Sequence, residues 1–348
     1  MDGARRDGVV LAVDGGNAKT DLALLQASGR LLSLVRGGGS SPHNLGVDGS
    51  LEVLDSLLDR AAGSAGLEWR GRPLASTAQI LLAGADLPDE RSVLRERIEQ
   101  RGWSERLVVD TDIVALLRAG TDRGWGVAVV CGAGINCLGR APDGREARFL
   151  ALGEVSGDWG GGGDVGLAAL AAAARSADGR GPRTILEAAV PAHFGLSDPL
   201  EVSRAVHMHQ IAPARLSELA PVVLALRDED PVAAGIVQRL AHEVIAFARA
   251  ALQRLELTRA DADVVLGGGL LRSVAQDVVQ TIRDGVQAVA ANAHVLVAPS
   301  EPIVGAALLG LDAIATDARA SARARAELDA AVRALARGSR ARTSDGVT

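Results

Sequence analysis

The sequence predicts a duplicated α/β fold of two domains with a cleft between them. Two sets of three short apolar runs, each set followed by helical segments, indicate that one structural unit occurs twice. A chain of 348 residues with 48% hydrophobic residues is long enough to build two cores. We place the first domain at residues 1–119, the second at 120–315, and a peripheral helix with a disordered tail at 316–348.

The first half begins with three apolar runs joined by turns, which we interpret as antiparallel strands at residues 9–13, 22–25 and 31–35. A loop rich in glycine and serine at 37–44 follows, and leucines at helical spacing resume near Leu51. The rest of this half alternates between strand and helix, as is typical of an α/β domain. These segments are strand 79–83, helix 91–101, strand 107–109 and helix 112–119.

The second half repeats this opening and then becomes mostly helical. Its three predicted strands are 126–131, 136–140 and 148–152. The predicted helices are 167–175, 184–190, 199–207, 216–226 and 232–255, followed by a strand at 264–266 and a helix at 301–314. An Ala/Arg-rich stretch at 319–337 has apolar residues at helical spacing, which predicts the peripheral helix.

Composition excludes several classes of partner. The net charge of −6 comes without a basic stripe interleaved with aromatic residues, so we expect no nucleic-acid partner. No apolar run is long enough to span a membrane and the start lacks a signal-peptide hydrophobic region, so we expect a cytoplasmic protein with no membrane partner. Cys131 and Cys137 lie in apolar strand-like segments and are interpreted as reduced, structural thiols. His207 and His209 lack further ligands nearby, which disfavours a metal site.

Lys19 is the only lysine of the chain, and it lies in a predicted glycine-containing turn between two strand-like runs. Gly15 and Gly16 let a backbone approach an anion closely, while Lys19 and Thr20 supply a positive charge and a hydroxyl donor. Asp14 is placed to hold Mg²⁺ directly or through water. The segment therefore predicts a phosphate-binding loop. An ordinary β-hairpin turn is the alternative.

Two further glycine-containing loops follow strands. They are Gly132, Ala133 and Gly134, and Gly267, Gly268 and Gly269. Together with the first loop they indicate a nucleotide whose phosphates and adenosine are contacted by backbone groups.

With these motifs the chain resembles the sugar kinase, Hsp70 and actin superfamily. Within it, the chain is similar to the N-acetylglucosamine kinase group, which is related to the ATPases that activate 2-hydroxyacyl-CoA dehydratases. The resemblance extends to about Ala315 and implies two ribonuclease-H-like (actin-like ATPase) domains that use ATP and Mg²⁺. It identifies 14–20 and 132–136 as phosphate motifs and 267–270 as the adenosine motif. Residues 302–306 are similar to the helix that leads back toward the first domain.

The resemblance also assigns a catalytic residue. A phosphoryl acceptor hydroxyl needs a carboxylate to orient it and take its proton, and in this group that residue follows a strand and opens a helix. Asp112 matches this position, with Asp110 as its rival. A simple helix N-cap is the alternative for both.

The segment 153–164 looks like the sugar-binding turn of the group. Asp158 matches a hydroxyl-binding aspartate, and Trp159 stands where a glutamate is usual, so we expect its ring to form an apolar wall for an N-acetyl methyl group. Asn44 and Asn136 match sugar-contacting asparagines, and Asp86 is a further substrate-binding candidate. Each polar candidate could instead be a turn former.

We therefore expect an ATP-dependent kinase that phosphorylates N-acetylglucosamine at the 6-hydroxyl, with an amino sugar and ATP as its small-molecule partners. The alternatives are a glucosamine kinase, or an ATP-gated activator or sugar-sensing protein of the same fold. The two cysteines do not form a convincing pair for an iron–sulfur cluster, which disfavours the activator. A homodimer is considered for the assembly.

Overall fold

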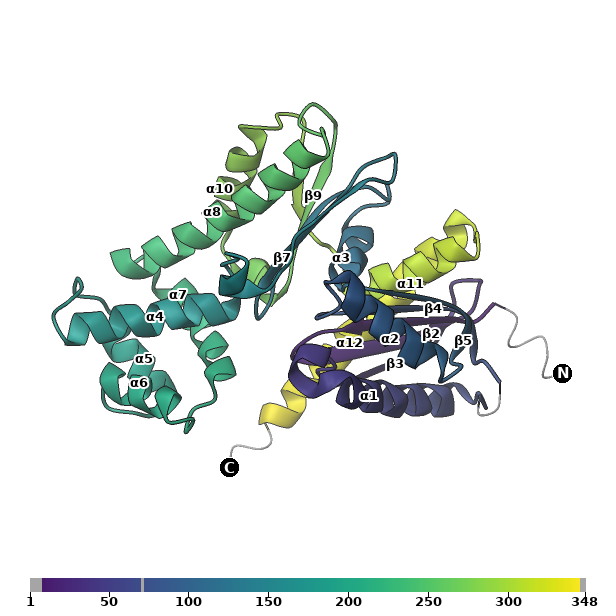
Figure 1. Ribbon diagram of the computed structural model, residues 1–348, viewed down its shortest axis with the longest axis horizontal. Coiled ribbons are helices and arrows are strands. Elements are labelled where there is room, and N and C mark those ends of the chain that lie inside the picture. The colour runs from purple at the N-terminus through teal and green to yellow at the C-terminus, as the bar shows by residue number, and fades with distance from the viewer. Residues whose placement is uncertain (1–7, 70–71, 345–348) are drawn as a thin grey trace. The chain divides into compact units, whose positions relative to one another are not determined.

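The computed structural model describes residues 8–69 and 72–344, with side chains up to residue 337. The chain divides into two compact units. One unit comprises the residues up to Gly124 together with those from Ala298 onward, and the other comprises Trp125–Val297 (Figure 1).

The first unit contains a five-stranded mixed sheet with strand order β3-β2-β1-β4-β5. Its strands are β1 (Val10–Gly15), β2 (Lys19–Leu25), β3 (Leu31–Gly38), β4 (Ala75–Leu82) and β5 (Ser104–Asp110). The first three strands are antiparallel neighbours, as the sequence predicts, while β4 and β5 run parallel to β1.

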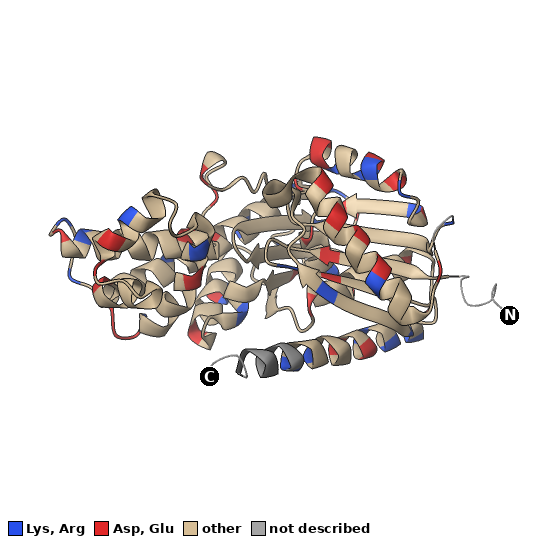
Figure 2. Cartoon of the chain, turned by 90° about the horizontal axis from the view of Figure 1, so that it is seen from below, with Lys and Arg blue, Asp and Glu red and all other residues tan. Residues whose placement is uncertain are grey.

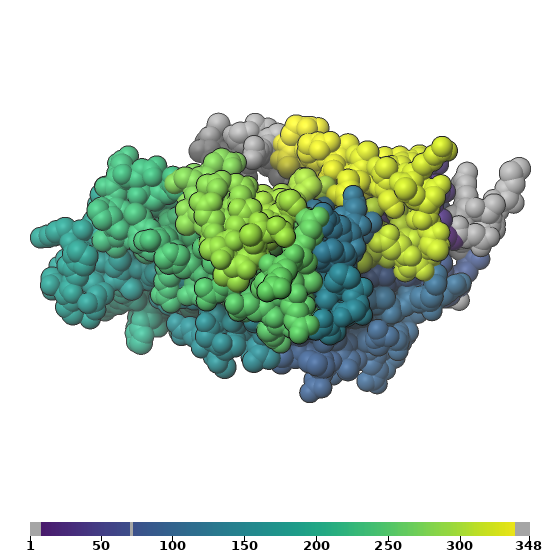
Figure 3. All heavy atoms as spheres, turned by 90° about the horizontal axis from the view of Figure 1, so that it is seen from above, coloured from purple at the N-terminus to yellow at the C-terminus, as the bar shows by residue number. Residues whose placement is uncertain are grey.

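Helices cover both faces of this sheet because successive strand residues point to opposite sides. Leu11 and Val13 pack in one core with apolar residues of α1 (Pro42–Ala65) and α2 (Pro88–Glu99). Val10 and Ala12 pack in another core with α3, α11 and α12. These three helices are Ile113–Gly120, Pro302–Ala313 and Ala318–Ser344. In Figure 3 the C-terminal segment, in yellow, lies on the outer surface of this unit.

The second unit repeats the strand order of the first. Its sheet has the order β10-β9-β6-β7-β8, in which β6, β7 and β8 are antiparallel and β9 and β10 are parallel to β6. The strands are β6 (Gly126–Cys131), β7 (Ile135–Arg140), β8 (Glu146–Arg148), β9 (Asp263–Gly267) and β10 (His294–Val297). The same order in two sheets confirms the predicted duplication and the α/β class.

A single core joins this second sheet to its helices. The helices are α4 (Gly162–Ala177), α5 (Leu186–Phe194), α6 (Pro199–His207), α7 (Ala220–Leu226), α8 (Pro231–Arg254), α9 (Gly269–Ser273) and α10 (Gln276–Gln287), with 3-10 turns at Gly153–Val155 and Pro213–Leu219. The inserted helices α4 to α7 follow β8 (Figure 1).

The domain boundaries differ from those we expected at 119/120 and 315/316. The α11 helix belongs to the first unit, because Ile303 and Val304 are fully buried in its core. A side chain at Gly305 would overlap the backbone of Ala115 in α3, which shows how closely the two helices pack.

Several element ends also differ from the sequence-based expectation. Lys19 begins β2 rather than lying in the turn, and α1 begins at Pro42 inside the expected loop, since proline suits the first helical position. β8 ends at Arg148, and Ala151 beyond it has a φ of 54°. β10 and α10 were not expected. α12 continues to Ser344, so residues 338–344 of the expected disordered tail are helical, while 345–348 lie outside the described residues.

Acidic and basic residues are interspersed along the helices (Figure 2). Among the residues that the structure describes, no helix is both long and apolar enough to cross a membrane.

Candidate functional site

The first unit brings charged residues together at the end of the β1–β2 hairpin. Asp14 lies directly opposite Asp21 in the β1–β2 pairing, and Asp21 lies opposite Arg36 in the β2–β3 pairing. Both aspartates are buried, and facing like charges are unfavourable unless they are compensated. Arg36 compensates Asp21, because its Nε and Nη2 donate to the two carboxylate oxygens at 2.6 and 2.7 Å.

Lys19 lies on the same face of the sheet, two residues before Asp21. Its Nζ donates to Glu301 Oε2 at 3.1 Å and lies 3.6 Å from Asp21 Oδ2. Glu301 precedes α11 and was not among the expected site residues. The lysine side chain is 41% exposed, so the ammonium group remains accessible to a ligand.

Asp112 lies at the start of α3 beside Thr111 and Asp86. The Thr111 hydroxyl donates to Asp86 Oδ1 at 2.7 Å and lies 3.4 Å from Asp112 Oδ1. Asp112 stands at the N-cap of α3, where its side chain makes no capping hydrogen bond to the helix. Its rival Asp110 instead accepts from the Thr111 backbone N–H at 2.8 Å and lies 3.9 Å from Arg91.

Burial and neighbouring charge shift the acid–base properties of these carboxyl groups. Burial, reinforced by the charge of Asp86, raises the pKa of Asp112 to about 7. Burial also raises the pKa of Asp14 well above its usual range, with Asp112 and Asp21 adding repulsion and Lys19 opposing it. The pKa of Asp86 is raised by burial as well, against the hydrogen bond from Thr111. The site therefore holds three carboxyl groups with raised pKa values, of which Asp112 exchanges protons near neutral pH.

Two other expected ligands of this unit have different positions. Asn44 is exposed, and its Nδ2 donates to Asn17 Oδ1 of the hairpin turn at 3.0 Å, so it lies beside the expected phosphate loop. Thr20 is fully buried, and its hydroxyl donates to Ser40 Oγ at 2.8 Å. The expectation that the Thr20 hydroxyl is available to a phosphate is therefore wrong, because successive strand residues alternate faces and Lys19 occupies the other face.

In the second unit, two glycine loops are packed directly on each other. The backbone N–H groups of Gly162 and Gly163 donate to the carbonyl oxygens of Gly132 and Ala133 at 2.8 and 3.0 Å. A side chain at Gly161 would overlap the backbone of Ala133 and Gly134. The expected sugar-binding turn and the expected second phosphate loop therefore pack together as one hydrogen-bonded unit.

The expected adenosine loop joins the same region. Gly267 pairs with Val130 at the end of β6, and Gly268 has a φ of 88°. A side chain at Gly268 would overlap the backbone of Cys131, so glycine is required both for the conformation and for the close approach. Gly269 begins α9. The three loops of this unit therefore meet at the ends of β6 and β9.

The expected sugar ligands of this unit are mostly held by local contacts. Asp158 is buried and accepts a hydrogen bond from the Ser156 hydroxyl, and Asn136 Oδ1 accepts from the Cys137 backbone N–H at 2.7 Å. Trp159 is only 9% exposed and packs in the core. The guanidinium of Arg239 lies 4.0 Å from the centroid of its ring. The expectation that Trp159 offers an apolar wall to a substrate is therefore wrong, because its ring is already covered.

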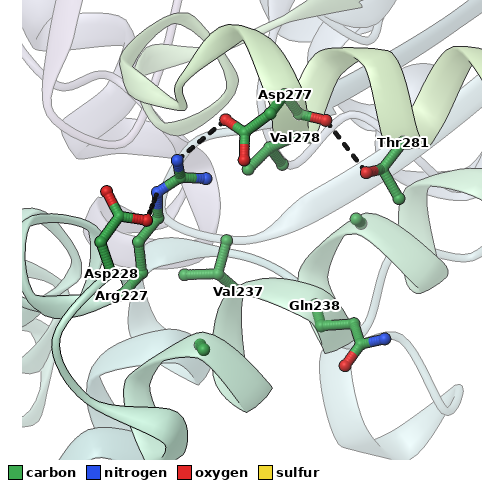
Figure 4. A pocket seen from close by; sticks show the side chains of 9 residues that line it. Arg227, Asp228, Val237, Gln238, Asp277, Val278 and Thr281 are labelled. Carbon is green, nitrogen blue, oxygen red and sulfur yellow. Dashed lines mark hydrogen bonds and ion pairs between the residues drawn. The ribbon is translucent and has the colours of Figure 1, made fainter.

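A cavity of about 320 Å³ elsewhere in the second unit contains none of the expected site residues in its lining. In Figure 4 the Arg227 side chain points toward Asp277 and Asp228, and it pairs with them at 2.8 and 3.3 Å. The Thr281 hydroxyl donates to the Asp277 carbonyl oxygen at 2.9 Å. Since these polar groups already satisfy one another, we assign this cavity no ligand.

Sequence reasoning missed four residues that organise the site. Glu301 and Thr111 are described above, and Asp21 could have been found as a charged residue within an apolar strand run. Asp164 accepts from the backbone N–H groups of Gly160 and Gly161 at 3.0 and 3.1 Å and so holds the glycine loop at the start of α4. An aspartate three residues into a helix after a glycine N-cap is the available signal.

Residues 11–310 match the sequence profile of the BadF/BadG/BcrA/BcrD ATPase family. An N-acetylmuramic acid/N-acetylglucosamine kinase of Clostridium acetobutylicum is 27% identical over 266 residues, which cover 76% of this chain and 86% of that protein. A candidate N-acetylglucosamine kinase structure from Chromobacterium violaceum has a TM-score of 0.68 and 27% identity, with 87% of this chain and 99% of that chain covered.

A more distant similarity supports the fold alone. A ROK family glucokinase of Streptomyces griseus, solved with glucose and AMPPNP, has a TM-score of 0.54 at 18% identity, covering 87% of this chain and 99% of that chain. Together the comparisons confirm the resemblance inferred from the motifs and the predicted fold class.

Proposed function

This chain belongs to the BadF/BadG/BcrA/BcrD ATPase family, and from that membership we propose that it transfers the γ-phosphoryl group of ATP to the 6-hydroxyl of N-acetylglucosamine. The two amino-sugar kinases at 27% identity support this acceptor. The single observation that carries the chemistry is Asp112, a carboxyl group at the start of a helix whose pKa is raised to about 7.

Asp112 has the properties required of the general base. A base whose pKa lies near the operating pH is both available in its ionised form and able to accept a proton. In the proposed step, the sugar O6 forms a bond to the γ-phosphorus while the bond from that phosphorus to the β–γ bridging oxygen breaks. Asp112 takes the hydroxyl proton, and ADP leaves. Burial and the charge of Asp86 raise the pKa of Asp112, and the Thr111 hydroxyl, which lies between the two carboxylates, opposes that rise.

The residues of the first unit fit a divalent cation. Asp14 is a buried carboxyl group whose charge is opposed by Asp112 and Asp21, so a cation beside it would stabilise its ionised form. The residues that the structure describes contain no cluster of three or more ligating side chains. This suits Mg²⁺, which commonly uses one or two carboxylates together with phosphate oxygens and water. When bound, Mg²⁺ would neutralise charge on the phosphates, and Asp14 would hold it.

The remaining proposed contacts follow the placements described above. Lys19 supplies positive charge to the phosphates, and the glycine loops at Gly15–Gly16, Gly132–Gly134 and Gly267–Gly269 allow the nucleotide to approach the backbone closely. Asn44, Asp86, Asn136 and Asp158 are the proposed sugar ligands. We propose a cytoplasmic enzyme without nucleic-acid partners, supported by the net charge of −6, and a homodimer stays a prediction.

A coupled assay of ADP release tests the function, with N-acetylglucosamine, glucosamine and N-acetylmuramic acid as separate acceptors. We expect turnover that depends on the acetylated sugars and exceeds the rate with glucosamine. Asp112→Asn should lower kcat by about 10²- to 10⁴-fold while ATP still binds, because asparagine keeps the shape but cannot take the proton.

Asp110→Asn is the matched control, since Asp110 contacts a backbone N–H and Arg91. An inactive Asp110→Asn with an active Asp112→Asn would refute the assignment of the base. A rate of ADP release that is the same with and without each sugar would refute the proposed kinase activity.

A further inference from the structure

We propose that Glu301 is a positioning residue for nucleotide binding, which pairs with the Lys19 ammonium group and competes with nucleotide phosphate for it. This inference rests on the proposed function, because it places a phosphate at Lys19. It adds to that function a residue that sets nucleotide affinity without contacting the sugar.

The contact between the two side chains is specific. Lys19 Nζ donates to Glu301 Oε2 at 3.1 Å although the two residues are 282 positions apart in the sequence. The lysine side chain is 41% exposed and the glutamate 27% exposed, so a ligand can reach the pair. Because Lys19 is the only lysine of the chain, the glutamate engages the one ammonium side chain that the protein possesses.

The neighbouring carboxylate is a weaker partner for Lys19. Asp21 Oδ2 lies 3.6 Å from Nζ, but both oxygens of Asp21 already accept hydrogen bonds from Arg36. The charge of Asp21 is therefore balanced without the lysine. Glu301 is thus the main anionic partner that a nucleotide phosphate would have to replace.

The glutamate side chain is not required to begin its helix. Glu301 stands at the N-cap of α11, but its side chain makes no capping hydrogen bond to the helix. A carboxylate beside Lys19 contributes negative charge where the proposed phosphate would add more, so removing that charge should strengthen nucleotide binding.

The direct test measures ADP affinity by calorimetry in wild type, Glu301→Gln and Asp312→Asn. Asp312 is the matched control, because it lies at the far end of α11 and pairs with Arg118. We expect the Kd for ADP to fall about threefold to tenfold in Glu301→Gln, the range for removing one partly exposed ionic competitor, and to stay unchanged in Asp312→Asn. In a Lys19→Met background, Glu301→Gln should change the Kd by less than twofold.

The single lysine also permits a structural readout. Reductive methylation with ¹³C-formaldehyde labels Lys19 and the amino terminus while keeping the charge. We expect the Lys19 methyl signal to shift when Glu301 is replaced, and to shift again when ADP is added. In the kinase assay, Glu301→Gln should lower the KM for ATP with no rise in kcat. A purely structural role of Glu301 would not change KM alone in this way.

The outcomes separate this inference from the proposed function. Tighter ADP binding in Glu301→Gln supports the inference even if no sugar is phosphorylated. An unchanged or weaker affinity in that variant, with normal binding in wild type, overturns the inference alone. A change seen only with Mg²⁺ and absent in EDTA would make Glu301 a metal ligand and would also overturn it. A wild type that binds no ADP overturns both.

Discussion

Replacing Asp86 with asparagine should move the pH dependence of catalysis in a defined direction. The Thr111 hydroxyl lies 2.7 Å from Asp86 Oδ1 and 3.4 Å from Asp112 Oδ1, so these two carboxylate oxygens cannot be more than about 6.1 Å apart. Two unit charges at that distance repel by about 2.7 kcal/mol at an effective dielectric constant of 20, and by about half of that at 40. Because Asp86 is partly exposed, the smaller figure is the better guide.

A repulsion of about 1.4 kcal/mol corresponds to about one pH unit. In wild type the proposed base Asp112 is protonated below its pKa of about 7, so kcat should fall as the pH drops through that value. Asp86→Asn removes the second largest cause of the raised pKa and should shift the acid limb of the kcat profile down by about one unit. Thr111→Val removes a hydrogen bond that lowers the pKa of Asp112, so it should shift the limb upward.

The assay is the pH dependence of kcat at saturating ATP and sugar, which removes the effect of weaker sugar binding in Asp86→Asn from the comparison. Shifts of opposite sign in the two variants would establish the coupling. An acid limb that stays at the wild-type pH in both variants would refute the reasoning that Asp86 and Thr111 tune the base.

Three further predictions concern stability and packing. Asp112→Asn should raise the free energy of unfolding by about 2–4 kcal/mol at pH 8, and this gain should vanish below about pH 4. The reason is that folding raises the pKa of Asp112 from 3.8 to about 7, which costs the wild type stability as the pH rises between those values. Urea titrations at both pH values test this. Gly161→Ala should weaken ADP binding at least tenfold, because its Cβ would overlap the Ala133 backbone. In Gly163→Ala the new Cβ would lie 3.4 Å from the Ala133 carbonyl oxygen, so this variant should bind ADP within about threefold of wild type. Equal ADP affinities of the two variants in a titration would contradict the packing of the two loops. Trp159→Ala should lower the free energy of unfolding by about 3 kcal/mol, because its buried ring is lost from the core. The ratio of kcat/KM for N-acetylglucosamine to kcat/KM for glucosamine should change by less than twofold. A tenfold decrease in that ratio would instead show that the ring contacts the sugar.

Local patterns were sufficient to predict the strand-rich openings of both halves. The period-two apolar runs and the glycine turns between them depend on neighbouring residues, so β1, β2, β3, β6 and β7 were placed from the sequence. The short strand β10 was missed because four residues at a sheet edge give little periodic signal. The helix α10 was also missed, although Val278, Ile282 and Val286 recur at helical spacing and could have indicated it. The position of Asp112 after a strand and before a helix was also predictable.

Other properties of the site depend on contacts between distant segments. The α11 helix belongs to the first unit because it packs on β1 and α3, and no local sequence pattern reveals that packing. The burial of Trp159 under Arg239 likewise joins residues 80 positions apart, counted from their numbers in the chain. A residue that lies within a binding motif can therefore pack in the core instead.

By itself, the sequence determined which residue types stand at and beside the turns: the single lysine, the glycines that permit close backbone approach, and the aspartates that follow strands. Only the tertiary structure decided their chemical state. Burial and the proximity of Asp86 give Asp112 its pKa of about 7, and the return of the chain at α11 brings Glu301 within 3.1 Å of Lys19. Side-chain identity is a local property of the chain, whereas solvation and electrostatic interaction depend on which distant residues folding places nearby.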